Sequence, residues 1–351
     1  MNIVLNTADG RTRALRNFLK NMLENKILYA VIAPVEINKK ITGALVRSPE
    51  LMDKADPLAP VMPVNMARIV SDITKSAPPS DGKKIGVLLR SCEARALIEL
   101  VKLNQASLEN IITIGIDCFG TYPIKIPETG AREACQMCEY PEAPNTDITI
   151  GLAGYENDSF IILQGNTADG DSLLESYGAG AAAAEQLKKR EDAIESIRKE
   201  RIAKRDDVFA RYLGEITGLE NLHNVFASCI NCHNCRNACP VCYCRECLFD
   251  SPTFEWKADN YISLADKHGS IAVPRDRLLF HLTRLNHMAV SCVGCGACEE
   301  ACPNGISVFS LFRLSGDRVQ AAFNYIAGRS MDEPLPVTEF RENELESIGN
   351  Q

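Results

Sequence analysis

Two short cysteine motifs constrain the fold of this chain more than any other feature. Each motif reads C-x2-C-x2-C-x3-C-P. The first contains Cys229, Cys232, Cys235 and Cys239, and the second contains Cys292, Cys295, Cys298 and Cys302. This spacing is typical of loops that bind [4Fe–4S] clusters. Zinc sites usually separate two C-x2-C pairs by a longer gap, so the motifs predict iron–sulfur clusters rather than zinc ions.

The fourth cysteine of each motif is expected to bind the neighbouring cluster. In two-cluster ferredoxins, three thiolates of one loop bind three corners of a cube, and the cysteine before the proline reaches the other cluster. One predicted ligand set is therefore Cys229, Cys232, Cys235 and Cys302. The other predicted set is Cys292, Cys295, Cys298 and Cys239.

The composition limits the class of protein. A chain of 351 residues with 46% hydrophobic content is long enough for two or three domains. Its fifteen cysteines occur without a recognisable secretion signal, so we expect a reducing, cytoplasmic location. No run approaches the roughly 18 apolar residues of a membrane helix, so no direct membrane insertion is expected. The net charge of −8 argues against a nucleic-acid partner.

Residues 1–170 are predicted to form an α/β domain. A helix is expected after an N-cap at Asp9, and a buried strand over 27–35 follows it. A second helix is predicted near 64–73. Two further strands, at 84–90 and 110–117, enclose a helical pattern, and an extended segment is expected at 160–166.

The rest of the chain divides into three predicted parts. Residues 171–222 are rich in helix formers and in charges of both signs, which predicts a helical linker with a solvated charged face. Residues 223–330 are expected to form a small α+β ferredoxin-like domain, with an insert over 248–291 that contains a helix at 275–288. An extended tail is predicted over 331–351.

Four of the remaining cysteines lie in the α/β part. Cys92 and Cys118 each follow a predicted strand, and parallel strands place their carboxyl ends at one edge of a sheet. Cys135 and Cys138 form a C-x2-C loop just downstream. The four thiols are therefore candidates for a third cubane. The alternative is that Cys92 and Cys118 are small buried apolar residues, as free cysteines often are.

The same region resembles the β subunits of coenzyme F420-reducing hydrogenases and F420-dependent formate dehydrogenases. The resemblance covers roughly residues 8–165. It rests, in order, on DGRTRALRNFLKNMLENKILYAVIAPV (9–35), RSCEARAL (90–97), IGIDCFGTY (114–122) and CQMCEYPEAPNTDITIGLAG (135–154). It implies an FAD beside one [4Fe–4S] cluster, whose cysteines match Cys92, Cys118, Cys135 and Cys138. F420-linked relatives often carry ferredoxin motifs ahead of the flavin domain, whereas here the motifs follow it, so the electron carrier stays open between F420 and NAD(P).

The best candidate for the implied FAD site is the start of the first predicted helix. Gly10, Arg11 and Thr12 would offer backbone N–H groups, a close approach and a charged side chain to a pyrophosphate. An ordinary helix cap with a surface arginine is the alternative. Asn65, before the second predicted helix, is a further candidate. No G-x-G-x-x-G follows a strand, so a Rossmann-type site is not supported.

Three cysteines after the first motif, Cys242, Cys244 and Cys247, have no obvious assignment. As metal ligands they need a fourth group, and His233 or Asp250 are the candidates. A fourth cluster, a zinc ion, a redistribution of ligands with the first motif, and free thiols all remain open. No side-chain arrangement typical of catalytic residues is recognisable.

These features predict an iron–sulfur flavoprotein that serves as the β-like electron-transfer subunit of a cytosolic oxidoreductase. It would pass electrons between a formate dehydrogenase or hydrogenase catalytic subunit and F420 or NAD(P), through three or four [4Fe–4S] clusters and FAD. The alternative is a non-catalytic relay and docking module that links a dehydrogenase to a heterodisulfide reductase-like complex. Flavin content distinguishes the two.

Overall fold

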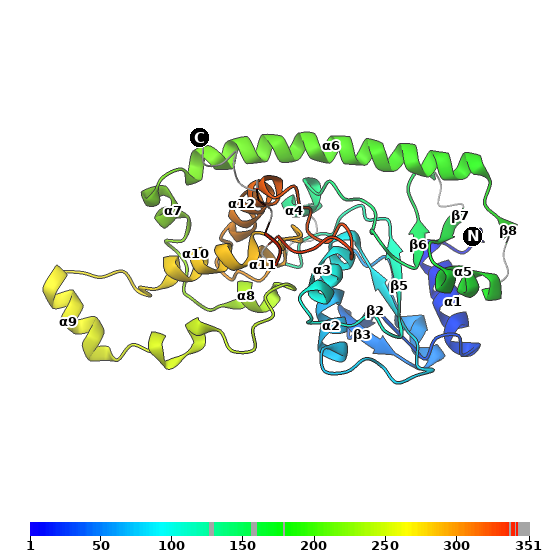
Figure 1. Ribbon diagram of the computed structural model, residues 1–351, viewed down its shortest axis with the longest axis horizontal. Coiled ribbons are helices and arrows are strands. Elements are labelled where there is room, and N and C mark those ends of the chain that lie inside the picture. The colour runs from blue at the N-terminus through cyan, green and yellow to red at the C-terminus, as the bar shows by residue number, and fades with distance from the viewer. Residues whose placement is uncertain (126–129, 156–159, 178–179, 337, 341, 343–351) are drawn as a thin grey trace.

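The computed structural model describes residues 1–125, 130–155, 160–177, 180–336, 338–340 and 342 of the chain. A β-sheet lies at one end of the molecule, and the helices that carry the two cysteine motifs lie at the other (Figure 1). One long helix, α6 (Ala184–Ile216), runs beside both parts. The predicted α/β character of the N-terminal part is confirmed.

The sheet has eight strands in the order β3-β2-β4-β5-β6-β7-β1-β8. Neighbours from β2 to β6 are parallel, and the other pairs are antiparallel. The strands are β1 Asn2–Asn6, β2 Ala30–Ile37, β3 Lys40–Val46, β4 Ile85–Leu89, β5 Ile111–Ile116, β6 Ile148–Gly151, β7 Phe160–Gly165 and β8 Gly180–Ala181. The strands predicted at 27–35, 84–90, 110–117 and 160–166 are confirmed within a few residues, whereas β1, β3, β6 and β8 were not predicted.

Helices cover both faces of the sheet, which explains why its central strands are almost wholly apolar. Along β4, Val87 packs toward one face and Leu88 toward the other. Helices α2 (Met66–Thr74) and α3 (Ser91–Lys102) cover the first face. Helices α1 (Arg11–Glu24) and α5 (Ala168–Tyr177), with the 3-10 turn η1 (Pro49–Lys54), cover the second.

Strands β1, β2, β4, β5 and β6 point in the same direction, and the segments after β1, β4, β5 and β6 determine where the functional groups meet. Strands β4, β5 and β6 are parallel, and β1 has their direction because it lies antiparallel to β7, which is itself antiparallel to β6. The segments that follow these four strands therefore emerge at one edge of the sheet. This is the edge at which open α/β sheets usually bind ligands.

The first helix begins one residue later than predicted. Its N-cap is Gly10, whose φ of 90° is unfavourable for residues with a side chain, and no side chain caps the helix. Asp9 instead forms an ion pair of 3.9 Å with Arg13. The start of α1 is therefore left without a capping side chain.

Helix α6 is more than a solvated linker. Its sequence is charged, yet Arg190, Ile194, Arg201 and Val208 are buried. Arg190 forms an ion pair with Asp117 after β5, and the helix also packs against α12 (Val308–Ala322) and α4 (Glu133–Gln136). The expectation of a solvated charged face is therefore wrong for this stripe, because the guanidinium groups find buried acidic and carbonyl partners.

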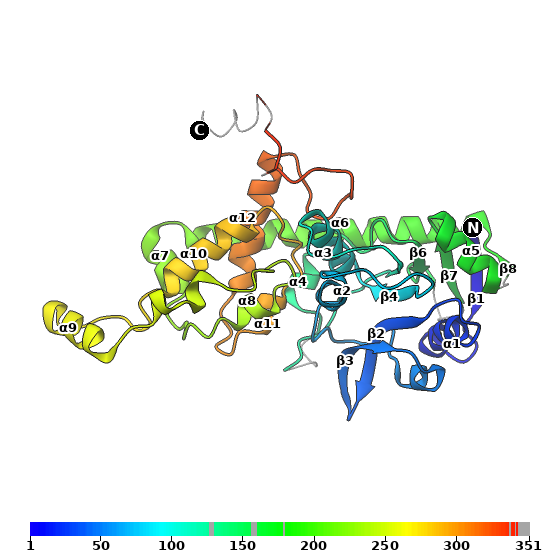
Figure 2. The same ribbon diagram turned by 60° about the horizontal axis from the view of Figure 1, so that its bottom comes forward.

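The part that carries the cysteine motifs is helical. Between residues 182 and 336 the structure contains no β-strand, so the predicted small α+β domain is corrected to a helical one. Its helices are α7 Leu219–Val225, α8 Asn234–Ala238, η4 Leu248–Asp250, η5 Pro252–Phe254, α9 Ala258–His268, α10 Arg277–Met288, α11 Ala297–Glu300 and α12. Helix α10 confirms the helix predicted at 275–288, and α9 projects from the rest of the molecule in both views (Figures 1 and 2).

One hydrophobic core continues from the sheet into the helical part. Ile32 and Leu97 of the α/β part belong to the same buried cluster as Phe280 and Phe312 of the helical part. The two parts are therefore held in a defined orientation. Residues 337, 341 and 343–351 of the predicted tail lie outside the described residues. Within the described ranges, no helix combines the length and apolar character needed to cross a membrane.

Candidate metal centres and the adjoining cavity

The structure brings Cys302 to the cysteines of the first motif. Burial raises the pKa of Cys229, and the nearby thiols of Cys232 and Cys302 raise this pKa further. Cys235 adjoins the same group: burial raises the pKa of its thiol, and the nearby thiols of Cys229 and Cys232 raise this pKa further. Cys235 and Cys302 are buried, whereas Cys232 is exposed. We refer to Cys229, Cys232, Cys235 and Cys302 as the first set.

Cys239 likewise leaves its own motif and joins the cysteines of the second. Burial and then the Cys239 thiol raise the pKa of Cys295 to about 12. The same two causes raise the pKa of Cys298 well above its usual value, with Cys292 also adjacent. We refer to Cys292, Cys295, Cys298 and Cys239 as the second set. The proximity of these thiols agrees with the predicted exchange of the fourth cysteines between the motifs. The assignment of the ligands stays a prediction.

The local backbone explains the crossing. Each motif turns through a left-handed residue, His233 in the first and Gly296 in the second, and then forms one of the short helices α8 and α11. These two helices pack against each other. The cysteine at the end of each helix, Cys239 or Cys302, is thereby placed beside the loop of the other motif.

A buried arginine lies between the two sets. Arg284 on α10 donates a hydrogen bond of 3.1 Å to the sulfur of Cys235 and one of 3.2 Å to its carbonyl oxygen. Its guanidinium also interacts with the thiols of Cys239 and Cys298. Only 3% of Arg284 is exposed, and its guanidinium carbon lies 4.8 Å from the ring centre of Phe312. A buried positive charge here suits anionic thiolates on both sides.

The four cysteines of the α/β part also gather in one place, which we call the third set. Burial and then the thiol of Cys295 raise the pKa of Cys92 well above its usual value, with Cys118 and Cys138 adding to the effect. Cys135 in turn adjoins Cys118. The four thiols are therefore mutual neighbours rather than isolated buried residues. Cys92 also lies beside the second set.

The surroundings of Cys135 suit an anionic sulfur. Burial alone would raise the pKa of this thiol, but Arg132 and hydrogen bonds from Thr121 outweigh burial and lower it. The donor atoms Thr121 N and Arg132 Nη2 lie 3.4 Å and 3.6 Å from the Cys135 sulfur. Arg132 Nε and Nη1 are buried without a hydrogen-bond partner, on a side chain that faces Cys92 and Cys295. Unpartnered buried donors beside thiols fit a cluster whose sulfides accept hydrogen bonds.

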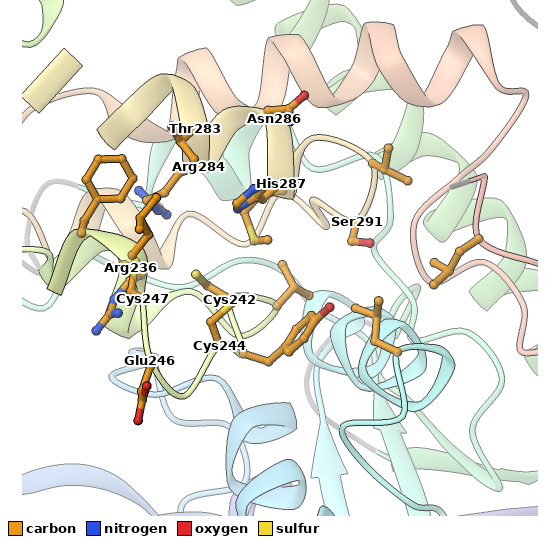
Figure 3. Close-up of a pocket in the computed structure, with 18 residues that line it drawn as sticks. Arg236, Cys242, Cys244, Glu246, Cys247, Thr283, Arg284, Asn286, His287 and Ser291 are labelled. Atoms are coloured by element: carbon orange, nitrogen blue, oxygen red, sulfur yellow. The ribbon is translucent and has the colours of Figure 1, made fainter. Parts of the chain in front are cut away.

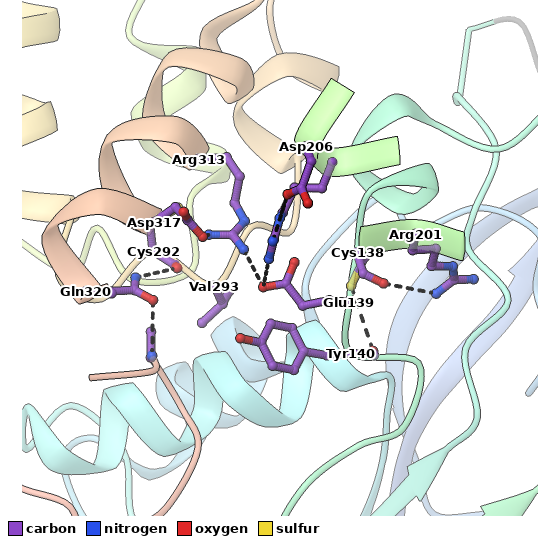
Figure 4. A network of polar contacts seen from close by, with 12 residues as sticks. Cys138, Glu139, Tyr140, Arg201, Asp206, Cys292, Val293, Arg313, Asp317 and Gln320 are labelled. Atoms are coloured by element: carbon purple, nitrogen blue, oxygen red, sulfur yellow. Dashed lines mark hydrogen bonds and ion pairs between the residues drawn. The ribbon is translucent and has the colours of Figure 1, made fainter. Parts of the chain in front are cut away.

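A network of ion pairs holds the third set against the second (Figure 4). Glu139, next to Cys138, accepts a hydrogen bond of 2.8 Å from Arg313 on α12 and pairs with Arg205 on α6 at 3.2 Å. Burial acts to raise the pKa of Glu139, but these two arginines lower it. On the other side of the network, Gln320 donates to the carbonyl of Cys292 at 3.0 Å. Helix α12 therefore contacts both sets, through Arg313 beside the third and through Gln320 at the second.

A cavity of about 940 Å³ opens at the sheet edge beside the third set. The segments after β1, β4, β5 and β6 all line it, through Gly10, Arg90, Cys118 and Leu152 among others. Its volume is in the range of pockets that hold cofactor-sized ligands. Because Cys118 lines the cavity, a ligand bound there would adjoin the third set.

The predicted residues at the start of α1 lie in this cavity. Gly10, Arg11 and Thr12 line it together with Arg13 and Arg16. A Cβ added to Gly10 would meet no atom within 4 Å, so the backbone at the helix start faces open space. Arg11 donates a hydrogen bond of 2.9 Å to the carbonyl of Tyr155. A helix N-terminus with several arginines fits a pyrophosphate.

Asn65 does not belong to this cavity, which corrects the second candidate. Its side chain caps α2 by accepting a hydrogen bond of 3.1 Å from Ala67 N, and it is buried. Arg90 lines the cavity instead, and its guanidinium donates to the carbonyl of Ala59 at 2.6 Å. The position of Arg90 directly after β4 was the sequence signal that could have identified it.

The candidate fourth ligands for Cys242, Cys244 and Cys247 are engaged elsewhere. His233 Nδ1 and Asp250 Oδ1 lie 2.7 Å apart, and Asp250 also pairs with Arg236 at 2.6 Å. The three cysteines line a separate cavity, together with His287. In the described part of the chain, no three His, Cys, Asp or Glu side chains form a group that could hold a single metal ion.

Comparisons with known proteins agree with the resemblance stated above. Residues 225–306 match the family model described as a 4Fe-4S dicluster domain. The chain is 26% identical to the F420-dependent formate dehydrogenase subunit beta of Methanocaldococcus jannaschii, over 92% of this chain and 93% of that protein. It is 25% identical to the F420-dependent formate dehydrogenase 1 subunit beta of Methanococcus maripaludis, over 92% of each chain. A chain of the F420-reducing [NiFe] hydrogenase complex from Methanosarcina barkeri aligns with a TM-score of 0.47 and 14% identity, over 63% of this chain and 94% of that chain.

The resemblance to these β subunits is therefore confirmed, and it extends beyond the N-terminal part on which it was first based. The iron–sulfur character of residues 225–306 is confirmed as well. The number of clusters, the ligand sets and the flavin site remain predictions.

Proposed function

We propose that this chain is the electron-transfer subunit of an oxidoreductase, with three [4Fe–4S] clusters and one FAD. The first, second and third sets would hold the clusters, and the cavity at the sheet edge would hold the flavin. Clusters carry single electrons, and a flavin exchanges single electrons for a hydride.

One observation carries this proposal: the cysteine sets form an uninterrupted series that ends at the cavity. Arg284 contacts cysteines of the first and second sets, Cys92 of the third set lies beside Cys295 of the second, and Cys118 of the third set lines the cavity. At the opposite end, Cys232 of the first set is exposed. The series thus has one end at the surface and the other at a cofactor-sized pocket.

The residues around the sets have definite roles in this proposal. Arg284 and Arg132 compensate negative charge between adjacent sets, which would otherwise oppose placing electrons there. The ion pairs of Glu139 keep the second and third sets at a constant separation. Partial burial of the second set limits the access of water to its sulfurs.

At the cavity, the helix start and its arginines would bind the FAD pyrophosphate. Gly10 would allow the backbone to approach, and Arg11 and Arg13 would donate charge-assisted hydrogen bonds. The same cavity opens to solvent, which lets a soluble carrier reach the flavin.

The similar β subunits support the assignment of carrier and partner. Both are named as subunits of F420-dependent formate dehydrogenase. We therefore infer that the carrier is F420 rather than NAD(P), and that the partner is a formate dehydrogenase catalytic subunit, which would dock near the exposed Cys232.

The test is anaerobic purification of the full chain, followed by iron, sulfide and flavin analysis and by reduction assays with F420, NADH and NADPH. We expect one FAD per chain and reduction by reduced F420 alone. Reduction by NADH or NADPH at a comparable rate would contradict the assignment of F420. Protein that carries clusters without flavin would contradict the whole proposal and favour a relay and docking module, for instance toward a heterodisulfide reductase-like partner.

A further inference from the structure

A second cavity, of about 480 Å³, is lined by Cys242, a neighbour of Cys239, and has no role in the function proposed above. It is enclosed by the loop over residues 241–249 and by the C-terminal half of α10 (Figure 3). Val241, Phe249 and Met288 are among the apolar residues that line it. This cavity is therefore largely apolar and lies in the cysteine-rich part of the chain.

Three thiols line the cavity, all from one short segment. Cys242, Cys244 and Cys247 follow the first motif at spacings of two and three residues, and each contributes to the wall. His287 on α10 lines the cavity from another element (Figure 3). Four groups that bind iron therefore surround one space. The close sequence spacing resembles that of the established motifs, where three thiolates of one loop bind one cubane.

Positive charge is available to balance the thiolates. Arg236 on α8 lines the cavity, and the thiols of Cys247 and Cys242 are close enough to raise the pKa of its guanidinium. Arg284 also lines the cavity, and its charge acts on Cys242 as well as on the first and second sets. Two buried or half-buried guanidinium groups beside three thiols are typical of an anionic cofactor rather than of free thiols.

We propose that Cys242, Cys244 and Cys247 bind a fourth [4Fe–4S] cluster in this cavity, with His287 as its fourth ligand. A zinc ion is the competing occupant. Zinc gathers four ligands around a single point, and no such group of side chains is formed in the described part of the chain. The cavity that the three thiols line, of about 480 Å³, has room for a cubane. The cluster would lie next to Cys239 of the second set, and it would approach the surface at Cys244, which is exposed. It would therefore form a branch from the series of clusters.

The decisive measurement is the difference in iron and sulfide content between two full-length proteins prepared anaerobically. The test variant is Cys244→Ser/Cys247→Ser, and the matched control is Tyr243→Phe on the same loop. We expect the test variant to contain about four fewer irons and about four fewer sulfides per chain than the wild type, and the control to lose none. The measurement compares the iron and sulfide contents of two proteins. Its result therefore does not depend on the flavin or on the function proposed above.

The histidine ligand has its own test. His287→Cys replaces an imidazole with a thiolate and should keep all the iron while changing the Mössbauer and EPR signals of one cluster. His287→Ala should lose about one iron per chain and produce a three-iron signal. Identical spectra for wild type, His287→Cys and His287→Ala would exclude His287 as a ligand.

Two results would overturn the proposal. The first is a wild-type protein that contains about one zinc per chain and a Cys244→Ser/Cys247→Ser variant that contains none, which would identify a zinc site. The second is unchanged iron, sulfide and zinc in that variant, which would show that the thiols are free. Retention of the other clusters, seen by EPR, controls for misfolding of the variant.

Discussion

Arg284 Nη1 lies 3.1 Å from the sulfur of Cys235, with both residues in the interior of the helical part. The guanidinium is therefore a fixed positive charge at the junction of two candidate clusters. A cluster bound by the neighbouring cysteines would therefore have a higher reduction potential, because a reduced cluster carries one more negative charge.

Arg284→Met should lower the potential of at least one cluster. One charge at a separation of about 8 Å contributes on the order of 2 kcal/mol at an effective dielectric constant of about 20. This corresponds to a shift on the order of 50–100 mV for a one-electron couple. Redox titration followed by EPR measures the shift, and Arg275→Met, an exposed arginine near Trp256, provides the control. Equal potentials in both variants would exclude an electrostatic role for Arg284.

Cys302→Ser tests the crossing of ligands. Because the Cys302 thiol lies close to Cys229, the variant should damage the cluster of the first set and spare that of the second. Cys239→Ser should have the reverse effect. Mössbauer and EPR spectra of the two variants identify which cluster is lost. Loss of the second-set signal in Cys302→Ser would show that the ligands do not cross.

Cys135→Ala should remove the third cluster. The hydrogen bonds from Thr121 and Arg132 would lose their acceptor, and about four irons per chain should be lost. Gln136→Ala, at the adjacent exposed position of α4, should retain all of them. Electron transfer between the flavin and the other clusters should also fail in Cys135→Ala. Unchanged iron content in this variant would remove the third site.

Arg11→Glu should weaken FAD retention. Charge-assisted hydrogen bonds contribute on the order of 1.5–3 kcal/mol each, so their loss corresponds to a tenfold or greater drop in affinity. Flavin content after gel filtration measures the effect, and iron content should stay constant. Lys20→Glu makes the same charge change on α1 outside the cavity. If α1 had an ordinary capped start instead, an acid in its first turn would be harmless or mildly stabilising, and undiminished FAD in Arg11→Glu would move the flavin site elsewhere.

Arg190→Met should destabilise the protein. Arg190 binds both carboxylate oxygens of Asp117, at 3.0 Å and 2.6 Å, and the Asp117 side chain has no exposed surface. Removing one partner of a buried ion pair leaves an uncompensated charge and costs about 3–5 kcal/mol. A lower midpoint of denaturant unfolding under anaerobic conditions measures this cost. Lys189→Met changes the neighbouring exposed residue, and its midpoint should move little.

Local patterns in the chain predicted much of this molecule. The two C-x2-C-x2-C-x3-C-P motifs indicated iron–sulfur clusters because three ligands of a cubane come from one short loop, so their spacing is visible in the sequence. The strands β4 and β5 were predictable for a similar reason. Their buried apolar runs are short, and polar residues end each run shortly before Cys92 or Cys118.

The tertiary structure alone decided which charged residues are buried and which cavities exist. Arg190 and Arg201 belong to a charged helix whose sequence suggests a solvated face, and only the packing of α6 against the sheet edge shows that they are inside. Asn65 was a plausible ligand residue by position, but its hydrogen bond to Ala67 makes it a helix cap. The cavity beside Cys242 and His287 depends on α10 folding back over a loop about forty residues earlier. Ligand spacing within a loop is a local property and can be read from the sequence, whereas burial and enclosure arise from contacts between distant segments.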